Sequence, residues 1–119
     1  MKLNISLKEL KNLYDGEEEA LSDLAHMFCP HAIQVMAELE GYHKHLDYYL
    51  YSKVLHQLKG CIAYLHLPEL VNKIKRMEFE LDSGGLSTFG ARHTELQSTM
   101  SILIDKIQLE ILTPSKVFK

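Results

Sequence analysis

Residues 51–65, YSKVLHQLKGCIAYL, decide the fold, because their apolar side chains recur at helical spacing. Each residue of an α-helix turns the chain by about 100°. The apolar residues therefore gather on one side, roughly 160–240° from His56: Tyr51, Val54, Leu58, Ile62 and Leu65. The stretch predicts an amphipathic helix that buries its Leu/Ile face and presents His56 to solvent.

The stripe around His56 is polar or small, and within about 60° it holds Ser52, Lys53, Lys59, Gly60 and Ala63. A neutral imidazole keeps a lone pair on one ring nitrogen, so His56 can act as a nucleophile. Phosphoryl transfer depends mainly on positioning and charge stabilisation, and Lys59 can supply the charge. Gly60 leaves space for another protein's active site. The stripe suits a phosphoryl carrier, although most solvent-facing His/Lys pairs on amphipathic helices have no function.

Residues 56–65, HQLKGCIAYL, resemble the signature of the histidine-containing phosphotransfer domain, written H-x-L-K-G-small-small-x-x-aliphatic. Upstream, the acidic turn 15–18, the apolar residues that follow it and Pro30 in mid-helix are similar to the family's long second helix. Downstream, residues 65–70 are similar to its inter-helix turn. The resemblance extends over roughly residues 5–112, nearly the whole chain.

Two positions depart from the family pattern. Ile62 stands where the family usually has a small residue, and His66 stands where it usually has glycine. Ile62 points about 240° away from His56 and is expected to alter core packing, whereas His66, about 15 Å along the axis, is expected to affect how the helix ends. Neither departure touches His56, Lys59 or Gly60.

The resemblance implies that His56 is the phospho-acceptor of a multistep two-component phosphorelay and that the chain is a carrier and not an autonomous enzyme. Its implied partners are response-regulator receiver domains and a hybrid sensor kinase. The receiver would supply Mg²⁺ and most catalytic groups, so we expect no cofactor or metal on this chain. Lys59 would stabilise phosphoryl charge, and the docking surface for the partner would comprise Gly60, Ser52, Lys53 and Ala63.

A nucleophilic imidazole also benefits from a partner on its other nitrogen, which fixes the tautomer and the ring orientation. In the family a Glu or Gln on the adjacent helix has this role, about 22 residues after the histidine, and here that position is Glu78. Glu78 follows the core residue Met77 and is expected on the flank of its helix, facing His56. The competing interpretation is an exposed surface glutamate.

Composition agrees with a single globular domain. The chain has 119 residues, 46% of them hydrophobic, and a net charge of −3, so nothing suggests nucleic-acid binding. A basic run, Lys73, Lys75 and Arg76, is interpreted as a solvated helix face that can assist docking to an acidic partner. The sequence contains no long apolar span and no signal-peptide pattern, and we expect a cytoplasmic monomer that binds no membrane. Cys29 and Cys61 lack metal or redox spacing and are expected to be reduced and partly buried.

The helix signals predict five helices. Ser6 and Glu9 form a capping box for a helix over 7–14, and Asp15 with Glu18 caps a second helix that Pro30 kinks near Met27 and Gly41 ends. Residues 43–46 connect it to the His56 helix, which Asp47 caps. Pro68 begins a fourth helix with the stripe Leu70, Ile74, Met77 and Leu81, ended by residues 83–85. The last helix carries Leu96, Met100, Leu103, Ile107 and Ile111, and Thr113-Pro114 stops it.

These elements predict an all-α fold, an antiparallel up-down four-helix bundle with the short first helix as a lid, in a single domain over 1–119. The six tyrosines are interpreted as core and rim of the bundle. Two other functions stay open. One is a helical adaptor that binds receiver domains or other signalling partners without being phosphorylated, although an adaptor has no need of His56, Lys59 and Gly60 together. The other, weaker one is a metal site at His43-x-His45 or at His26 and His31, whose five-residue spacing suits one ion poorly.

Overall fold

The computed structural model describes residues 5–84 and 86–112, and within them every regular element is a helix. The elements are, in chain order, α1 (Lys8–Leu13), α2 (Glu18–Lys44), α3 (Tyr48–Ala63), α4 (Pro68–Ser83), the 3-10 turn η1 (Leu86–Thr88), α5 (Phe89–Ile107) and the π-helical turn η2 (Gln108–Leu112). The expected all-α class is confirmed.

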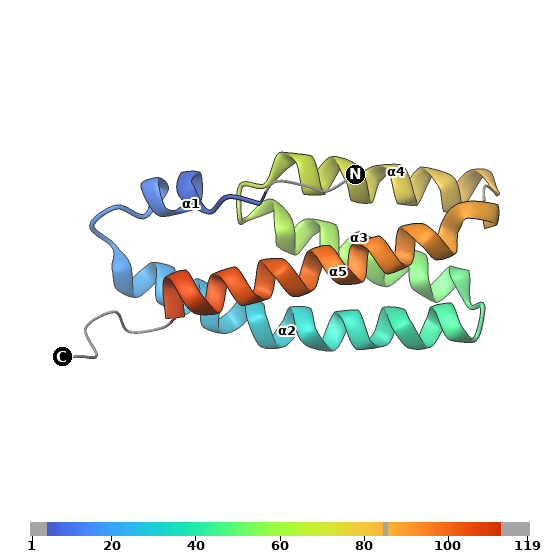
Figure 1. The fold of residues 1–119 in the computed structure, drawn as a ribbon, viewed down its shortest axis with the longest axis horizontal. Coiled ribbons are helices and arrows are strands. Elements are labelled where there is room, and N and C mark those ends of the chain that lie inside the picture. Colours follow the sequence, from blue (N-terminus) through green and yellow to red (C-terminus); the bar gives the residue numbers. More distant parts are fainter. Residues whose placement is uncertain (1–4, 85, 113–119) are drawn as a thin grey trace.

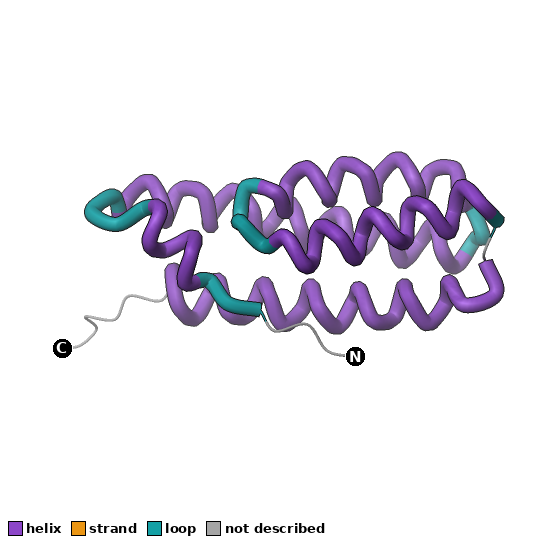
Figure 2. The backbone as a smooth tube through the Cα atoms, turned by 90° about the horizontal axis from the view of Figure 1, so that it is seen from above, coloured by secondary structure: helices purple, strands orange, loops and turns teal. Residues whose placement is uncertain are grey.

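The long helices α2, α3, α4 and α5 lie side by side, and successive ones run in opposite directions (Figure 1). Helix α3 packs against α2 and α4, and α5 packs against the same two helices. Seen from above, the connections between these helices lie at their ends (Figure 2). A groove open to solvent lies between α3 and α4 and is lined by side chains of both helices.

The core is formed by the apolar stripes of the helices. On α3 the predicted stripe is buried throughout, and Ile62 is fully inaccessible, as expected for a core position. On α4, Leu70, Ile74 and Met77 are buried and Leu81 lies partly buried at the edge. Burying one such side chain contributes roughly 1.5–3 kcal/mol. The predicted core faces of these two helices are confirmed, and they orient the polar stripe of α3 outward.

Helix α1 packs on the rest of the chain through Leu7 and Leu10, which are almost fully buried. An ion pair from Lys11 Nζ to Glu110 Oε1, 2.8 Å long, links it to η2. The predicted capping box is wrong. The Oγ of Ser6 accepts from the backbone N–H of Lys8, two residues on, and Leu7 is the residue that precedes the helix.

Helix α2 differs from its predicted bounds at both ends. It begins at Glu18 without a side-chain cap, after a turn in which Gly16 has φ +82°. It continues as one helix through Pro30 and through Gly41 to Lys44, so the connection is 45–47 and not 43–46. Packing explains the extension, because His43 in the last turn lies against Tyr48 and Phe89.

The ends of α3 and α4 follow the predicted signals. The Oδ1 of Asp47 accepts from the N–H of Leu50 and caps α3, and Pro68 occupies the first turn of α4. Gly84 ends α4 in the left-handed conformation, with φ +80°. His66, just after α3, has φ +58°, a backbone region that favours glycine, so the family's usual glycine at this position has a physical reason.

Ion pairs join α4 to α5. Lys73 Nζ lies 2.6 Å from Glu95 Oε1, and Arg92 pairs with Glu80. Lys73 is buried, so its predicted place on a solvated basic face is wrong, although Lys75 and Arg76 are exposed. The alkyl stem of a lysine packs well on apolar surface while its ammonium reaches a carboxylate, which accounts for the burial.

Helix α5 buries Leu96, Met100, Leu103 and Ile107, the predicted stripe, and Ile111 in η2 is half-buried. The predicted stop at Thr113-Pro114 lies outside the described residues. Among the helices that the structure describes, none has the length and apolar character needed to cross a membrane.

Candidate functional site

His56 stands in the middle of α3 and meets α4 across the groove between the two helices. Its Nδ1 lies 2.8 Å from Oε2 of Glu78 on α4. The other carboxylate oxygen, Oε1, accepts a hydrogen bond from Lys59 Nζ at 2.6 Å. One carboxylate on α4 thus binds two side chains of α3 that are one helical turn apart, and the structure brings together the three residues expected to form the site.

Exposure differs sharply among the three side chains. The imidazole of His56 is 72% exposed, whereas the side chains of Glu78 and Lys59 are 18% and 20% exposed. The carboxylate and the ammonium are therefore held at the base of the groove, and the imidazole projects from it. The expectation that His56 faces solvent is confirmed.

The electrostatics of Glu78 favour its charged form. Partial burial alone would raise the pKa of this carboxyl, but the hydrogen bonds from Lys59 and His56, and their charges, outweigh burial and hold the pKa below its usual range. At neutral pH Glu78 is an ionised acceptor. A carboxylate cannot donate, so Nδ1 of a neutral His56 carries the proton and Nε2 keeps its lone pair.

Lys59 is not the free cation that the sequence suggests. Its ammonium is bound to Glu78, and the ion pair neutralises much of its charge locally. Besides contributing positive potential beside His56, Lys59 fixes the position of the Glu78 carboxylate.

The rim of the groove around His56 consists of polar side chains from both helices. Ser52, Lys53 and Gln57 on α3 line it together with Asp82 on α4. Sequence reasoning placed Ser52 and Lys53 here but missed Gln57 and Asp82. Asp82 follows Glu78 by four residues and so shares its helix face, a signal that was available in the sequence.

Gly60 and Ala63 lie on the exposed surface of α3 beyond this groove. A Cβ added at Gly60 would meet no atom of the described residues within 4 Å, so the helix itself has no steric need for glycine there. Because glycine in a helix interior is unfavourable by about 0.8–1.0 kcal/mol relative to alanine, the bare backbone beside His56 is a cost without a local structural benefit.

The histidines considered for a metal do not converge. Nδ1 of His26 bonds to the carbonyl of Ser22 and Nδ1 of His45 bonds to that of Gly41, each at 2.9 Å. His43 instead stacks on His93, with ring centroids 4.4 Å apart. Within residues 5–84 and 86–112, no group of three or more His, Cys, Asp or Glu is arranged to hold a metal ion. Both cysteines are free, Cys29 buried and Cys61 partly so.

A second polar cluster, missed in the sequence, lies where α2, α3 and α5 meet. The buried His93 bonds through Nδ1 to the hydroxyl of Tyr51 at 2.7 Å and through Nε2 to Oε1 of Glu40 at 2.8 Å. Burial raises the pKa of the Tyr51 hydroxyl, which keeps its proton and donates it. His43 completes the cluster, and its buried Nδ1 has no hydrogen-bond partner among the residues that the structure describes. Tyr51 and His93 are 42 residues apart, so no local sequence pattern predicts their contact.

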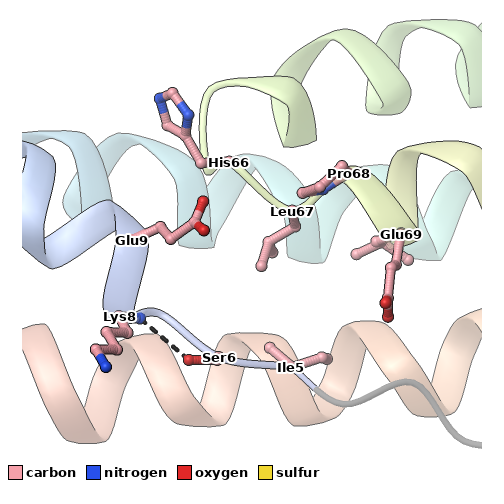
Figure 3. A pocket seen from close by; sticks show the side chains of 9 residues that line it. Ile5, Ser6, Lys8, Glu9, His66, Leu67, Pro68 and Glu69 are labelled. Atoms are coloured by element: carbon pink, nitrogen blue, oxygen red, sulfur yellow. Dashed lines mark hydrogen bonds between the residues drawn. The ribbon is translucent and has the colours of Figure 1, made fainter.

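A separate cleft of about 340 Å³ lies between the segment that leads into α1 and the turn from α3 to α4 (Figure 3). Its walls include Ile5, His66 and Pro68. It contains none of the three residues of the His56 site, and its lining combines apolar side chains with the charged Lys8 and Glu9.

We compared the chain with models of protein families, with curated proteins and with solved structures, and none of the three comparisons finds a match.

Proposed function

We propose that this chain is a histidine phosphotransfer protein, a phosphocarrier in a multistep two-component relay. His56 accepts a phosphoryl group from an aspartyl phosphate on a receiver domain, or from a histidine kinase, and passes it to the receiver domain of a response regulator. The observation that carries the proposal is the exposed His56 imidazole, whose Nδ1 is bound by the same Glu78 carboxylate that Lys59 holds.

The chemistry follows from the tautomer. Glu78 accepts a hydrogen bond from Nδ1–H, so the lone pair on Nε2 points away from the carboxylate and toward solvent. Nε2 attacks the phosphorus of the aspartyl phosphate, a P–N bond forms, and the P–O bond to the aspartate breaks and releases its carboxylate. The imidazole becomes positively charged as it is phosphorylated, and the negative Glu78 stabilises that charge through Nδ1–H. The reverse sequence returns the phosphoryl group to another aspartate.

The partner would complete the site. The receiver domain brings the Mg²⁺ and most of the catalytic groups, so this chain acts as a substrate-like carrier. Gly60 and Ala63 have small side chains or none, so little protrudes from the surface on their side of His56. Ser52 and Lys53 border His56 on the other side. These four residues form the proposed docking surface.

The arrangement of the helices supports the same proposal. We interpret it as an antiparallel up-down four-helix bundle with α1 as a lid, a scaffold that holds α3 and α4 rigidly side by side. Catalytic and binding side chains on rigid helices keep their geometry better than those on loops. We place the carrier in the cytoplasm as a monomer.

The test is phosphorylation by a partner. The purified chain is incubated with receiver domains bearing a ³²P-labelled aspartyl phosphate, and label on the chain is measured after gel separation. We expect label that is labile in acid and stable in base, as for a phosphoramidate, and that disappears in His56→Gln. The matched control is His31→Gln, an exposed histidine on α2, which should label normally.

Two results would contradict the proposal. Label that persists in His56→Gln would exclude His56 as the acceptor. Binding of receiver domains without any label would instead favour the adaptor.

A further inference from the structure

The groove around His56 has nearly balanced fixed charges before any phosphoryl group arrives. It is lined by two lysines, Lys53 and Lys59, and by two carboxylates, Glu78 and Asp82. A phosphoryl group adds about two negative charges. Phosphorylation of His56 therefore leaves the groove with an excess of negative charge, and a cation that turns toward the new group would stabilise it.

Lys59 is poorly placed to be that cation. Its ammonium is 2.6 Å from Oε1 of Glu78, and its side chain is only 20% exposed. If Lys59 moved to the phosphoryl group it would leave Glu78 with one hydrogen bond fewer in a partly buried place, where an unmatched charge is costly. It would also release the carboxylate that orients His56.

Among the described residues, the Lys53 ammonium is not held by either carboxylate of the groove. It is exposed, and its Nζ lies over the ring of Tyr49, 5.0 Å from the centroid. Tyr49 is itself 70% exposed. A cation over an exposed ring is held more weakly than a cation that makes charge-assisted hydrogen bonds to phosphate oxygens. The exchange of the ring for a phosphoryl group is therefore favourable.

The direction of helical side chains brings the two together. Residues three apart on a helix are neighbours, and side chains lean toward the N-terminal end of their helix. The imidazole of His56 thus leans toward the turn that carries Ser52 and Lys53, and away from Gly60. A phosphoryl group on Nε2 extends on the Lys53 side, while the Gly60 side stays open for the partner.

We propose that Lys53 is the phosphoryl-binding residue of this chain, and that it leaves the Tyr49 ring to bind the phosphate oxygens once His56 is phosphorylated. This inference rests on the proposed function, since it requires a phosphoryl group on His56. It divides the work of the two lysines: Lys59 positions Glu78, and Lys53 holds the phosphoryl group.

The test phosphorylates the full chain without any protein partner, using potassium phosphoramidate. Nε2 of His56 displaces ammonia from the reagent, so one P–N bond forms and another breaks. The phosphohistidine is then titrated by ³¹P NMR. A nearby cation favours the dianionic phosphoryl group, so Lys53→Met should raise its pKa by about 0.2–0.7 units, the range expected for an exposed ion pair. Lys53→Arg should restore the wild-type midpoint.

Two further measurements separate this role from a general charge effect. Lys75→Met removes an exposed lysine from α4 outside this groove and should leave the midpoint unchanged. In the wild type, the Lys53 methylene protons next to Nζ should carry a ring-current shift from Tyr49, and that shift should disappear on phosphorylation.

The outcomes distinguish this inference from the function on which it rests. A phosphorylated His56 that titrates alike in wild type and Lys53→Met, or equal shifts in Lys53→Met and Lys75→Met, overturns the role of Lys53 alone. A clear Lys53 effect without any exchange of phosphate with receiver domains overturns the carrier function alone. Absence of phosphohistidine at His56 overturns both.

Discussion

His56 and Lys59, one turn apart on α3, share a single carboxylate on α4, that of Glu78. The link crosses between two helices, and it ties the orientation of an exposed imidazole to a partly buried ion pair. The geometry of His56 therefore depends on how firmly Glu78 is held, and each of the three residues can be tested separately.

Replacing Glu78 by alanine should change the protonation pattern of His56. Without the Glu78 carboxylate, the hydrogen bond that favours the proton on Nδ1 is lost, so the population with Nδ1 unprotonated should rise and phosphotransfer should slow. Nitrogen NMR of the His56 ring measures the tautomer ratio, and a labelled transfer assay measures the rate. Glu80→Gln, on the same helix but paired with Arg92, is the control. If Glu78→Ala altered neither tautomer nor rate, the orienting role would be withdrawn.

Replacing Lys59 by alanine should slow phosphotransfer, because Lys59 holds the Glu78 carboxylate that orients His56. The change removes a charge-assisted hydrogen bond, worth roughly 1.5–3 kcal/mol, which corresponds to about ten- to a hundredfold in rate. The melting temperature should fall by a modest amount, because Glu78 is partly buried and loses one hydrogen bond but keeps its bond to His56. Lys8→Ala, at an exposed lysine of α1 outside this groove, serves as the control. A normal transfer rate in Lys59→Ala would show that neither its charge nor its hold on Glu78 matters.

Part of the arrangement around His56 could be predicted from the sequence because it follows local rules. Helical periodicity places His56 opposite the buried stripe of α3, and the position of Glu78 next to the core residue Met77 places it on the flank facing α3. The caps at Asp47 and Pro68 fix where α3 and α4 begin, and so set their register. Short-range spacing and two capping residues predict the exposed position of His56 and the starts of the two helices, whereas Glu78 is identified as its partner from the family resemblance.

The features that escaped prediction depend on contacts between distant residues. Gly41 was expected to end α2, but the packing of His43 on Phe89 and His93 keeps the helix going for three more residues. Lys73 was expected in solvent, but Glu95 on α5 draws it into the interface. In both cases a partner at least 20 positions away in the chain outweighed a local preference, and one sequence alone does not reveal such partners.

The stacked pair His43 and His93 should make stability depend on pH. Burial, and then the proximity of His93, lowers the pKa of His43 from its ordinary value of 6.5, and Glu40 opposes the shift only in part. In the folded chain His43 stays neutral at pH values where the unfolded chain binds a proton. Its contribution to stability is therefore complete above pH 6.5 and is lost as the pH falls from 6.5 through the folded pKa.

Thermal melts between pH 7.5 and 5 test this dependence. Besides His93, the groups that face His43 are Tyr48, Phe89 and Glu40. His43→Phe keeps an aromatic ring but cannot be protonated, so it should lose less stability on acidification than the wild type. His31→Gln, an exposed histidine, should behave as the wild type does. The pKa of the Glu78 carboxyl is lowered from 4.5, so its protonation changes the stability only below about pH 4.5, outside the range of these melts. An identical fall in melting temperature for His43→Phe and wild type would exclude His43 as the cause.

Gly60 offers the sharpest test of the docking surface. Gly60→Gln introduces a good helix former into an exposed position with open space around its Cβ, so the free energy of unfolding should rise by about 0.5 kcal/mol. The new side chain, however, stands beside the imidazole where a receiver domain must approach, so phosphotransfer and receiver binding should fall sharply. Chemical phosphorylation by phosphoramidate, a small reagent, should be affected far less.

The matched control for Gly60→Gln is Gly90→Gln, an exposed glycine of α5 whose added Cβ also meets no atom within 4 Å. Both variants should be at least as stable as the wild type in a thermal melt, but only Gly60→Gln should lose transfer. A gain in stability together with a loss of phosphate exchange is expected only where the missing side chain makes room for a partner protein. A stable Gly60→Gln protein that exchanged phosphate with receiver domains at the normal rate would mean that no partner docks over this turn of α3, and the carrier proposal would lose its main structural support.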